Sequence, residues 1–328
     1  WHGGDELSSF KDNVGRFMSE YGMQSFPSQM AIDYFCPLKE QDINSDIIKS
    51  HQKASLGNGN IMKYILMYYK EPKDFSSFVM LSQIMAGEAI KVAVESHRIS
   101  MPYCMGSLYW QLNDCWPGAS WSSLDYFGNW KALHYYAKKF FSPLLICADT
   151  QSDIINVYVV NDGELIKKSK ILIELYDFKG NLVFEEKVVM DVKANSSTRV
   201  FSDKKDKVLN GLNAKNVMLR TSIDVDGVII STNDYFFEKT KLLNMDEQNF
   251  NVNVEKADAC YNIDIESKSF LNRFYALCLN DSGVFSDNYF NMLPGEKRRI
   301  QFIPSEKFNG STKFDPGLEF NSVLGLCS

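Results

Sequence analysis

The pattern of apolar residues changes near residue 142, and this change does most to limit the possible folds. Before it, strand-like and helix-like segments alternate; after Pro143, strand-like segments follow one another without helices. Strands that alternate with helices indicate a parallel sheet covered by helices, whereas consecutive strands separated by turns indicate a β-sandwich. A chain of 328 residues is long enough for two or three domains. We therefore expect a multidomain protein, α/β over residues 1–142 and all-β thereafter.

The first 142 residues contain two strand candidates, at 16–19 and at 105–112, and we expect the second to be buried. The strongest helix candidate is the stretch 76–98, because its apolar residues recur at steps of three and four. The other helix candidates are residues 46–54, 61–70 and 130–141. Two strand–helix units cannot close a sheet by themselves. The segment therefore resembles the last quarter of a (β/α)8 barrel, also called a TIM barrel.

After Pro143, two groups of strand candidates are separated by a polar linker at residues 241–248. The first group comprises residues 154–160, 170–176, 182–189, 198–201, 217–225 and 228–237. The second group comprises residues 250–255, 260–267, 274–280, 289–293 and 297–303. Turn signals such as Asp226-Gly227 separate neighbouring strands. The sequence thus predicts two β-sandwich domains, over residues 143–240 and 241–328.

Composition argues against several classes of function. The net charge is −6 and no basic stripe occurs, which disfavours nucleic acid and anionic membranes as main partners. No apolar run reaches the length of a membrane span. The seven cysteines include no C-x-x-C pair, so we expect buried free thiols rather than a zinc site or a disulfide frame. No catalytic triad, phosphate loop or nucleotide fingerprint is apparent, and we predict neither a metal nor a cofactor.

Glu20 is the first candidate for a catalytic residue. It follows a short apolar segment, and a carboxylate at the C-terminal end of a barrel strand faces the mouth where catalytic groups collect. Ser19 and Tyr21 could orient the carboxylate by hydrogen bonding, and Gly22 lets the backbone turn without a Cβ atom. The alternative is a surface glutamate, for instance one paired with Arg16.

The second candidate segment is the strand end at residues 106–117. Trp110 could present a flat apolar face to the C–H groups of a sugar ring, while Asn113 and Asp114 could bind hydroxyl groups. The alternative is ordinary packing of Trp110 at a barrel rim. Segments rich in tryptophan with so few basic residues favour carbohydrate over nucleic acid.

The third candidate segment, residues 119–131, is predicted to be a loop that leads into a helix. Asp125 is a candidate for substrate contact, although an aspartate in such a place often caps a turn. We expect Lys131 and His134 to have structural or solvated roles. Residues His51 and His97 lie on predicted helices, and we assign neither to a metal.

Together these segments resemble β-mannosidases of glycoside hydrolase family 2. The matching runs are residues 19–28 (SEYGMQSFPS), 108–117 (LYWQLNDCWP) and 121–135 (WSSLDYFGNWKALHY). The match is strong from residue 1 to about residue 142 and weaker through the β-rich remainder. The resemblance implies a central (β/α)8 barrel flanked by β-sandwiches, of which the two C-terminal ones are immunoglobulin-like.

The resemblance also implies an activity, namely the exo-acting, retaining hydrolysis of terminal non-reducing β-D-mannose from a β-mannoside oligosaccharide or glycan. It assigns Glu20 as the nucleophile and places Trp110 in the subsite of the sugar to be cleaved. In that family the acid/base glutamate lies in an Asn-Glu pair on an earlier strand, and no Asn-Glu dipeptide occurs in this chain. We therefore expect that residue in a missing N-terminal part of the same enzyme, and we expect these 328 residues to be inactive alone.

Three alternatives stay open at this point. The sugar could be a β-glucuronide or a β-galactoside, or the chain could be a non-catalytic carbohydrate-binding or scaffold module. Sequons of the type N-x-S/T, at Asn195, Asn280 and Asn309, permit a secretory or lysosomal origin. The many Lys, Asn and Ile residues instead favour a bacterial enzyme that is periplasmic or secreted.

Overall fold

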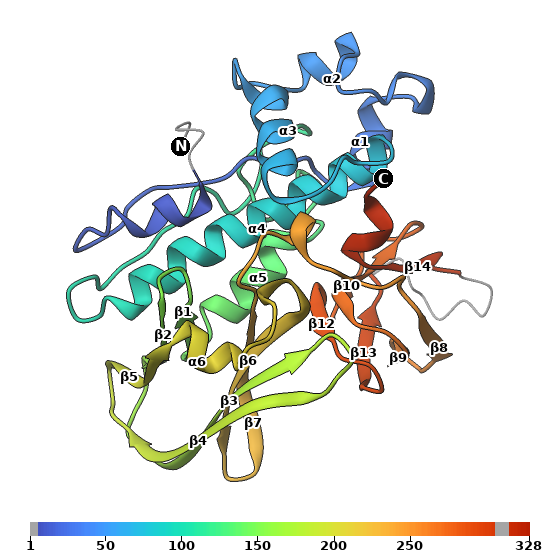
Figure 1. Cartoon of the computed structure of the whole chain (residues 1–328). Coiled ribbons are helices and arrows are strands. Elements are labelled where there is room, and N and C mark those ends of the chain that lie inside the picture. Colours follow the sequence, from blue (N-terminus) through green and yellow to red (C-terminus); the bar gives the residue numbers. More distant parts are fainter. Residues whose placement is uncertain (1–5, 306–314) are drawn as a thin grey trace.

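The computed structural model describes residues 6–305 and 315–328, so that the sequon at Asn309 lies outside the described residues. A helical region packs against two β-sandwiches, as Figure 1 shows. The α-helices of the helical region are α1 (Gln29–Phe35), α2 (Asp46–Ser50), α3 (Gly57–Tyr68), α4 (Phe75–Ile99) and α5 (Ala132–Phe140). Three of these match predicted helices closely, α2 ends earlier than predicted, and α1 was not predicted.

Helix α4 is the centre of the helical region. The carboxylate of Asp74 caps its first turn by accepting a hydrogen bond from the Ser77 amide at 2.7 Å, and the helix ends shortly before Pro102, as expected for a residue that breaks helices. By length and composition α4 could cross a membrane. However, 83% of its most apolar stretch is buried inside the structure, as in the core helix of a globular domain.

The two predicted barrel strands, which precede and follow α4 in the sequence, pair with each other in parallel. The amide of Met105 donates to the Arg16 carbonyl, that of Met18 to Gly106, and that of Leu108 to Met18, at 2.8–3.0 Å. The pairing is too short to form a regular strand, and it amounts to a single parallel bridge. Residues 16–21 and 105–110 are called the parallel pair below.

The expectation of a buried strand at residues 105–112 is wrong. Met105, Leu108 and Leu112 are 61%, 55% and 56% exposed, and Phe17 on the neighbouring segment is 58% exposed. A parallel strand becomes buried when strands flank it and helices cover both faces, and a two-segment pair provides neither. Within the described residues the α/β portion consists of the parallel pair and the helices α1 to α5 rather than a closed barrel.

The first sandwich consists of two antiparallel sheets. One sheet has the order β1 (Leu144–Asp149), β2 (Ile154–Asn161), β5 (Ser196–Lys204). The other has the order β4 (Leu182–Val192), β3 (Ile166–Asp177), β6 (Val217–Val225), β7 (Val228–Tyr235). Asp226 and Gly227 connect β6 to β7 with φ angles of 54° and 84°, which is the conformation of a tight two-residue hairpin. Apolar side chains from both sheets fill the space between them.

The second sandwich repeats this arrangement of three strands against four. One sheet has the order β12 (Phe290–Met292), β10 (Leu271–Cys278), β14 (Leu318–Asn321). The other has the order β11 (Val284–Phe285), β13 (Lys297–Ile303), β9 (Tyr261–Ser267), β8 (Phe250–Lys256). The predicted strands of both groups are present, whereas β1, β11 and β14 were not predicted.

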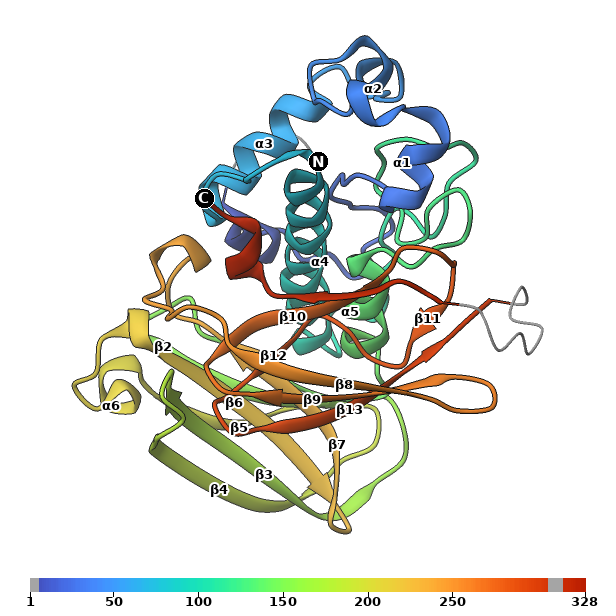
Figure 2. The same ribbon diagram turned by 90° about the vertical axis from the view of Figure 1, so that its right-hand side faces the viewer.

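Helix α4 is bonded to both sandwiches. Its Glu95 carboxylate accepts hydrogen bonds from Asn233 Nδ2 at 2.6 Å and from the Tyr235 hydroxyl at 3.1 Å, both on β7. Its Glu88 carboxylate pairs with Arg273 on β10. The apolar core of the helical region is continuous with that of the second sandwich. Figure 2 shows α4 and α5 side by side, next to the strands of the sandwiches.

The cysteines are free thiols in the structure. Cys36, Cys104 and Cys147 are buried, as predicted. The prediction is wrong for Cys115, which is exposed because it lies on the irregular loop after the parallel pair, and Cys260, Cys278 and Cys327 are only half-buried.

Candidate active site

Glu20 and Trp110 lie at the same end of the parallel pair. Glu20 is exposed, and Trp110 is 44% exposed. The Trp110 amide donates to the Tyr21 carbonyl at 2.7 Å, which continues the pairing to the end of both segments. Because parallel segments end side by side, these two exposed residues lie at the same end of the pair. The peptide bond from Trp110 to Gln111 is cis.

Gly22 lies where the segment after Glu20 closely approaches the backbone of Trp110. A Cβ atom at Gly22 would lie 2.4 Å from the Trp110 carbonyl oxygen and 3.0 Å from Cδ1 of Trp121. The first of these separations is too short for a real carbon atom. Glycine is therefore required for the segment after Glu20 to pass between the two tryptophans.

A partly buried polar network holds Tyr21, the residue after Glu20, in place. The Tyr21 hydroxyl and the Ser107 hydroxyl are 2.6 Å apart, and Nδ1 of His97 lies 2.8 Å from the same Ser107 oxygen. The rings of Tyr21 and His97 meet edge to face at 5.0 Å. Burial raises the pKa of Tyr21 to about 12 and lowers the pKa of His97 to about 4. Both side chains are thus neutral near pH 7, and they fix the backbone beside Glu20.

Sequence reasoning missed His97 and Ser107 as parts of this site. His97 lies in the last turn of α4 and Ser107 in the second segment of the parallel pair, so only the packing of α4 brings them together. In the described part of the chain, Nε2 of His97 is buried without a hydrogen-bond partner.

Asp114 and Asn113 have different surroundings. The Asp114 carboxylate accepts hydrogen bonds from the hydroxyls of Ser120 at 2.7 Å and Ser122 at 2.5 Å. It also accepts one from Nε2 of the Gln111 side chain at 3.2 Å. These bonds close the loop after Trp110, so Asp114 holds the loop in shape. Asn113 is exposed on that loop.

Asp125 is 1% exposed, although it was a candidate for substrate contact. Its carboxylate accepts hydrogen bonds from the Ser28 hydroxyl at 2.5 Å, the Phe127 amide at 3.0 Å and the Asn129 amide at 2.9 Å. This geometry favours the alternative role, in which Asp125 stabilises a turn and ties it to the segment that follows Glu20.

Lys131 and His134 have structural surroundings, as expected. Lys131 is fully buried, and its Nζ donates to the carbonyls of Ser25 at 3.2 Å and Ser120 at 3.4 Å. Burial lowers the pKa of Lys131 to about 8, although nearby Asp114 and Asp125 act to raise it. Nδ1 of His134 lies 2.9 Å from the Ser123 hydroxyl, and burial lowers its pKa.

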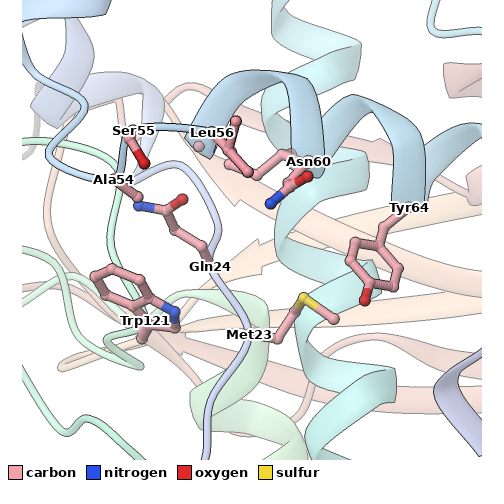
Figure 3. Close-up of a pocket in the computed structure, with 10 residues that line it drawn as sticks. Met23, Gln24, Ala54, Ser55, Leu56, Asn60, Tyr64 and Trp121 are labelled. Atoms are coloured by element: carbon pink, nitrogen blue, oxygen red, sulfur yellow. The ribbon is translucent and has the colours of Figure 1, made fainter. Parts of the chain in front are cut away.

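A cavity of about 340 Å³ opens beside the residues that follow Glu20. It lies between the start of α3 and the loop that carries Trp121 (Figure 3). Its lining consists of Met23, Gln24, Ala54, Ser55, Leu56, Gly57, Asn60, Ile61, Tyr64 and Trp121. These residues come from three separate stretches of sequence, so no local motif predicted the cavity. Among the described residues, no group of three or more His, Cys, Asp or Glu side chains is placed to hold a metal ion.

Comparison with known proteins finds both family models and relatives that are similar to this chain. Two family models match, a mannosidase Ig/CBM-like domain over residues 153–241 and an Ig-fold domain over residues 245–323. The β-mannosidase of Capra hircus is 26% identical over 94% of this chain, and that of Mus musculus is 28% identical over 88%. The crystal structure of the β-D-mannosidase of Dictyoglomus thermophilum covers 98% of this chain with a TM-score of 0.86 and 28% identity. The chain is related to the C-terminal portion of family 2 β-mannosidases.

The relation to β-mannosidases confirms the resemblance inferred from the sequence. This chain spans about 37% of the length of the Capra hircus β-mannosidase and 39% of the Dictyoglomus thermophilum structure. An exo-chitosanase from Amycolatopsis orientalis shares the fold at a TM-score of 0.74, with 16% identity. The two all-β domains are immunoglobulin-like, while the boundaries at 142/143 and 240/241 stay predictions.

Proposed function

We propose that this chain contributes Glu20 as nucleophile and Trp110 as sugar platform to a retaining, exo-acting β-mannosidase. The proposal rests chiefly on the parallel pair, which brings the ends of two barrel-like segments to one edge and exposes both side chains there. The similarity to β-mannosidases over most of the chain supports the same assignment. The substrate is a glycan with terminal β-D-mannose at its non-reducing end.

Retaining glycosidases need two carboxyl groups about 5–5.5 Å apart. In our proposal the ionised Glu20 attacks the anomeric carbon, while a protonated partner donates to the leaving oxygen and then activates water. That partner is a glutamate outside these 328 residues, because the chain contains no Asn-Glu pair. No step of this chemistry requires a metal or a cofactor.

Exposed apolar side chains on the parallel pair support a protein partner here. Phe17, Met105, Leu108 and Leu112 are each more than half exposed, and exposed apolar residues gathered on one short element favour the docking of further protein. We propose that the N-terminal part of the same enzyme covers this edge and completes a (β/α)8 barrel, of which residues 1–142 are the last portion. A periplasmic or secreted location, with the lysosome as the alternative, stays a prediction.

The test is hydrolysis of an aryl β-mannoside by the longer enzyme that contains this chain. We expect Glu20→Gln to lower kcat on the order of 10³-fold or more, because the covalent route is lost. The exposed Glu71 provides a matched control, and Glu71→Gln should leave the rate unchanged. Proton NMR of the first product should show the β-anomer, and release of the α-anomer would overturn the retaining mechanism.

Other outcomes identify the alternatives. Hydrolysis of an aryl β-glucuronide or β-galactoside in place of the mannoside would reject the sugar assignment. If Glu20→Gln leaves the activity intact, the chain is a non-catalytic module. The 328-residue chain alone should be inert, and turnover by it would place the acid/base group within these residues.

A further inference from the structure

We propose that the cavity beside Trp121 binds the second sugar ring of the substrate, the ring to which the terminal mannose is linked. This inference rests on the function proposed above and adds to it a binding site on the leaving-group side. The ligand is a neutral pyranose ring. Four features of the cavity carry the proposal, namely its position, its fixed acceptor, its amphipathic lining and its lack of charge.

The cavity adjoins the candidate active site. Met23 and Gln24 line it, and they follow Glu20 by only three and four residues in the sequence. Because an extended residue spans at most about 3.3–3.6 Å, the Cα atom of Met23 lies within roughly 11 Å of that of Glu20. Trp121 lines the cavity, and its Cδ1 atom would lie 3.0 Å from a Cβ atom at Gly22, so the cavity begins beside the residue two positions after Glu20.

A chain of amides fixes the orientation of Gln24. Its Nε2 donates to Gln52 Oε1 at 2.7 Å and to the Ala119 carbonyl at 3.3 Å. The Nε2 of Gln52 in turn donates to Asn58 Oδ1 at 2.9 Å. Both amide hydrogens of Gln24 are thereby committed, so its Oε1 is presented as a hydrogen-bond acceptor. Gln24 is only 7% exposed, so this acceptor is held in place before any ligand arrives.

The remaining lining has the two kinds of surface that a sugar ring needs. Figure 3 shows the indole of Trp121 below the Gln24 amide, with Asn60 and Tyr64 extending from α3 on the opposite side. An aromatic face packs against the apolar C–H face of a pyranose, and amide and hydroxyl groups bind its ring hydroxyls. The volume of about 340 Å³ lies near the lower end of the range for small-molecule sites, which is roughly 300–1,000 Å³.

The cavity lining that the structure describes carries no charged side chain, and this argues against charged ligands. Among the described residues that line the cavity, none has an ionisable acidic or basic side chain of the Asp, Glu, Lys, Arg or His type. A phosphate or a uronic acid would meet no counter-charge there, and an amino sugar would meet no carboxylate. A neutral hexose satisfies the lining without burying an unpaired charge.

Two variants test the cavity without touching Glu20 or Trp110. Ser55→Trp places a large ring in the cavity from an exposed turn, and Asn60→Leu removes an amide at similar size. Lys63→Ala is the matched control, because Lys63 is exposed on the same helix and does not line the cavity. The substrates are β-1,4-mannobiose, which has a second ring, and methyl β-D-mannoside, which has none.

In the longer enzyme, we expect both variants to lower kcat/KM for mannobiose at least tenfold and to change kcat/KM for the methyl mannoside less than twofold. Equal losses on both substrates, or no loss on either, would overturn the proposal. Calorimetric binding of mannobiose to the 328-residue chain provides an independent measurement. We expect saturable binding that Ser55→Trp abolishes and Lys63→Ala preserves.

The two measurements separate the two proposals. If mannobiose binds the chain in a Ser55-dependent way but the longer enzyme hydrolyses no mannoside, the proposed function fails and the sugar site stands. If the longer enzyme hydrolyses both substrates and Ser55→Trp affects neither binding nor kcat/KM, the sugar site fails and the proposed function stands.

Discussion

At the scale of single residues, Lys131 bears a clear electrostatic penalty beside the candidate site. Its ammonium group is fully buried between the backbone carbonyls of Ser25 and Ser120. Burial disfavours the charged form and lowers the pKa to about 8, against the opposing effect of Asp114 and Asp125. The unfolded chain has a lysine pKa of about 10.4. Between these two values the unfolded state binds more protons than the folded state.

This difference predicts a pH-dependent stability. The free energy of unfolding should rise as the pH increases from about 8 toward 10, because the cost of the buried charge is fully present below pH 8 and is relieved as Lys131 loses its proton. Relative to Lys131→Met, the wild-type chain should gain on the order of 1.5 kcal/mol between pH 8.0 and pH 9.5. Urea unfolding at both pH values measures this gain.

The control for this prediction is Lys63→Met, which removes an exposed lysine from α3. Its unfolding free energy should follow the pH dependence of the wild type. If Lys131→Met also follows the wild type across this range, Lys131 keeps an ordinary pKa in the folded chain, and the account of its burial is wrong.

Residue types alone could predict only part of the candidate site. Glu20 and Trp110 were singled out because a carboxylate and an aromatic ring follow strand-like segments, and the structure exposes both at one edge. The structural roles of Asp125 and Lys131 were among the alternatives. His97 and Ser107 could not be found, because their hydrogen bond depends on how α4 packs on the parallel pair, which no local pattern encodes.

At the scale of elements, the structure predicts that replacing glycine by alanine has opposite effects on stability at two positions. Gly22→Ala should destabilise the chain by about 2 kcal/mol or more, because its Cβ atom would lie 2.4 Å from a backbone carbonyl of the parallel pair. Gly59→Ala should stabilise it by about 0.5–1 kcal/mol, because Gly59 lies in α3 and a Cβ atom added there would meet nothing within 4 Å. Urea unfolding of both variants gives the comparison.

The result also tests the close approach at the candidate site. Under the proposed function, Gly22→Ala should lower the β-mannosidase activity of the longer enzyme, while Gly59→Ala should leave that activity unchanged. Wild-type stability in Gly22→Ala would mean that the segment after Glu20 has room to move, contrary to the packing described above.

The elements with a clear period were predicted well. Helix α4 was predicted almost to its ends, because its apolar residues keep a helical spacing over many turns. Strand β1 was missed because its residues are nearly all buried, so the strand lacks the alternation of apolar and polar residues that identifies a half-exposed strand. The segment 105–112 was assigned a buried environment from its apolar content, yet burial depends on neighbours that sequence periodicity does not reveal.

At the scale of the whole molecule, the ion pair between Glu88 on α4 and Arg273 on β10 joins the helical region to the second sandwich. Both side chains are largely buried, so Glu88→Gln leaves the Arg273 charge without its partner. We expect a loss of about 3–5 kcal/mol in the free energy of unfolding. Thermal unfolding followed by circular dichroism should show one transition at a lower temperature, because the two regions share one apolar core.

Glu71→Gln again serves as the control, since Glu71 is exposed. The double variant Glu88→Gln/Arg273→Met should be less destabilised than the sum of its single variants, because each single variant leaves a charged partner behind. Additive losses, or two separate thermal transitions, would contradict a direct link between α4 and the second sandwich.

Because α4 is bonded to both sandwiches, a mutation in a sandwich can act on the candidate site through this helix. The helix that carries Glu88 and Glu95 toward the sandwiches also carries His97, which fixes Ser107 and Tyr21 beside Glu20. A substitution at Arg273 can therefore shift the helix that supports the segment carrying Glu20 without touching the candidate site itself. In a screen for loss of function, such outer-domain variants would be grouped with active-site variants, and only a measurement of stability would tell the two groups apart.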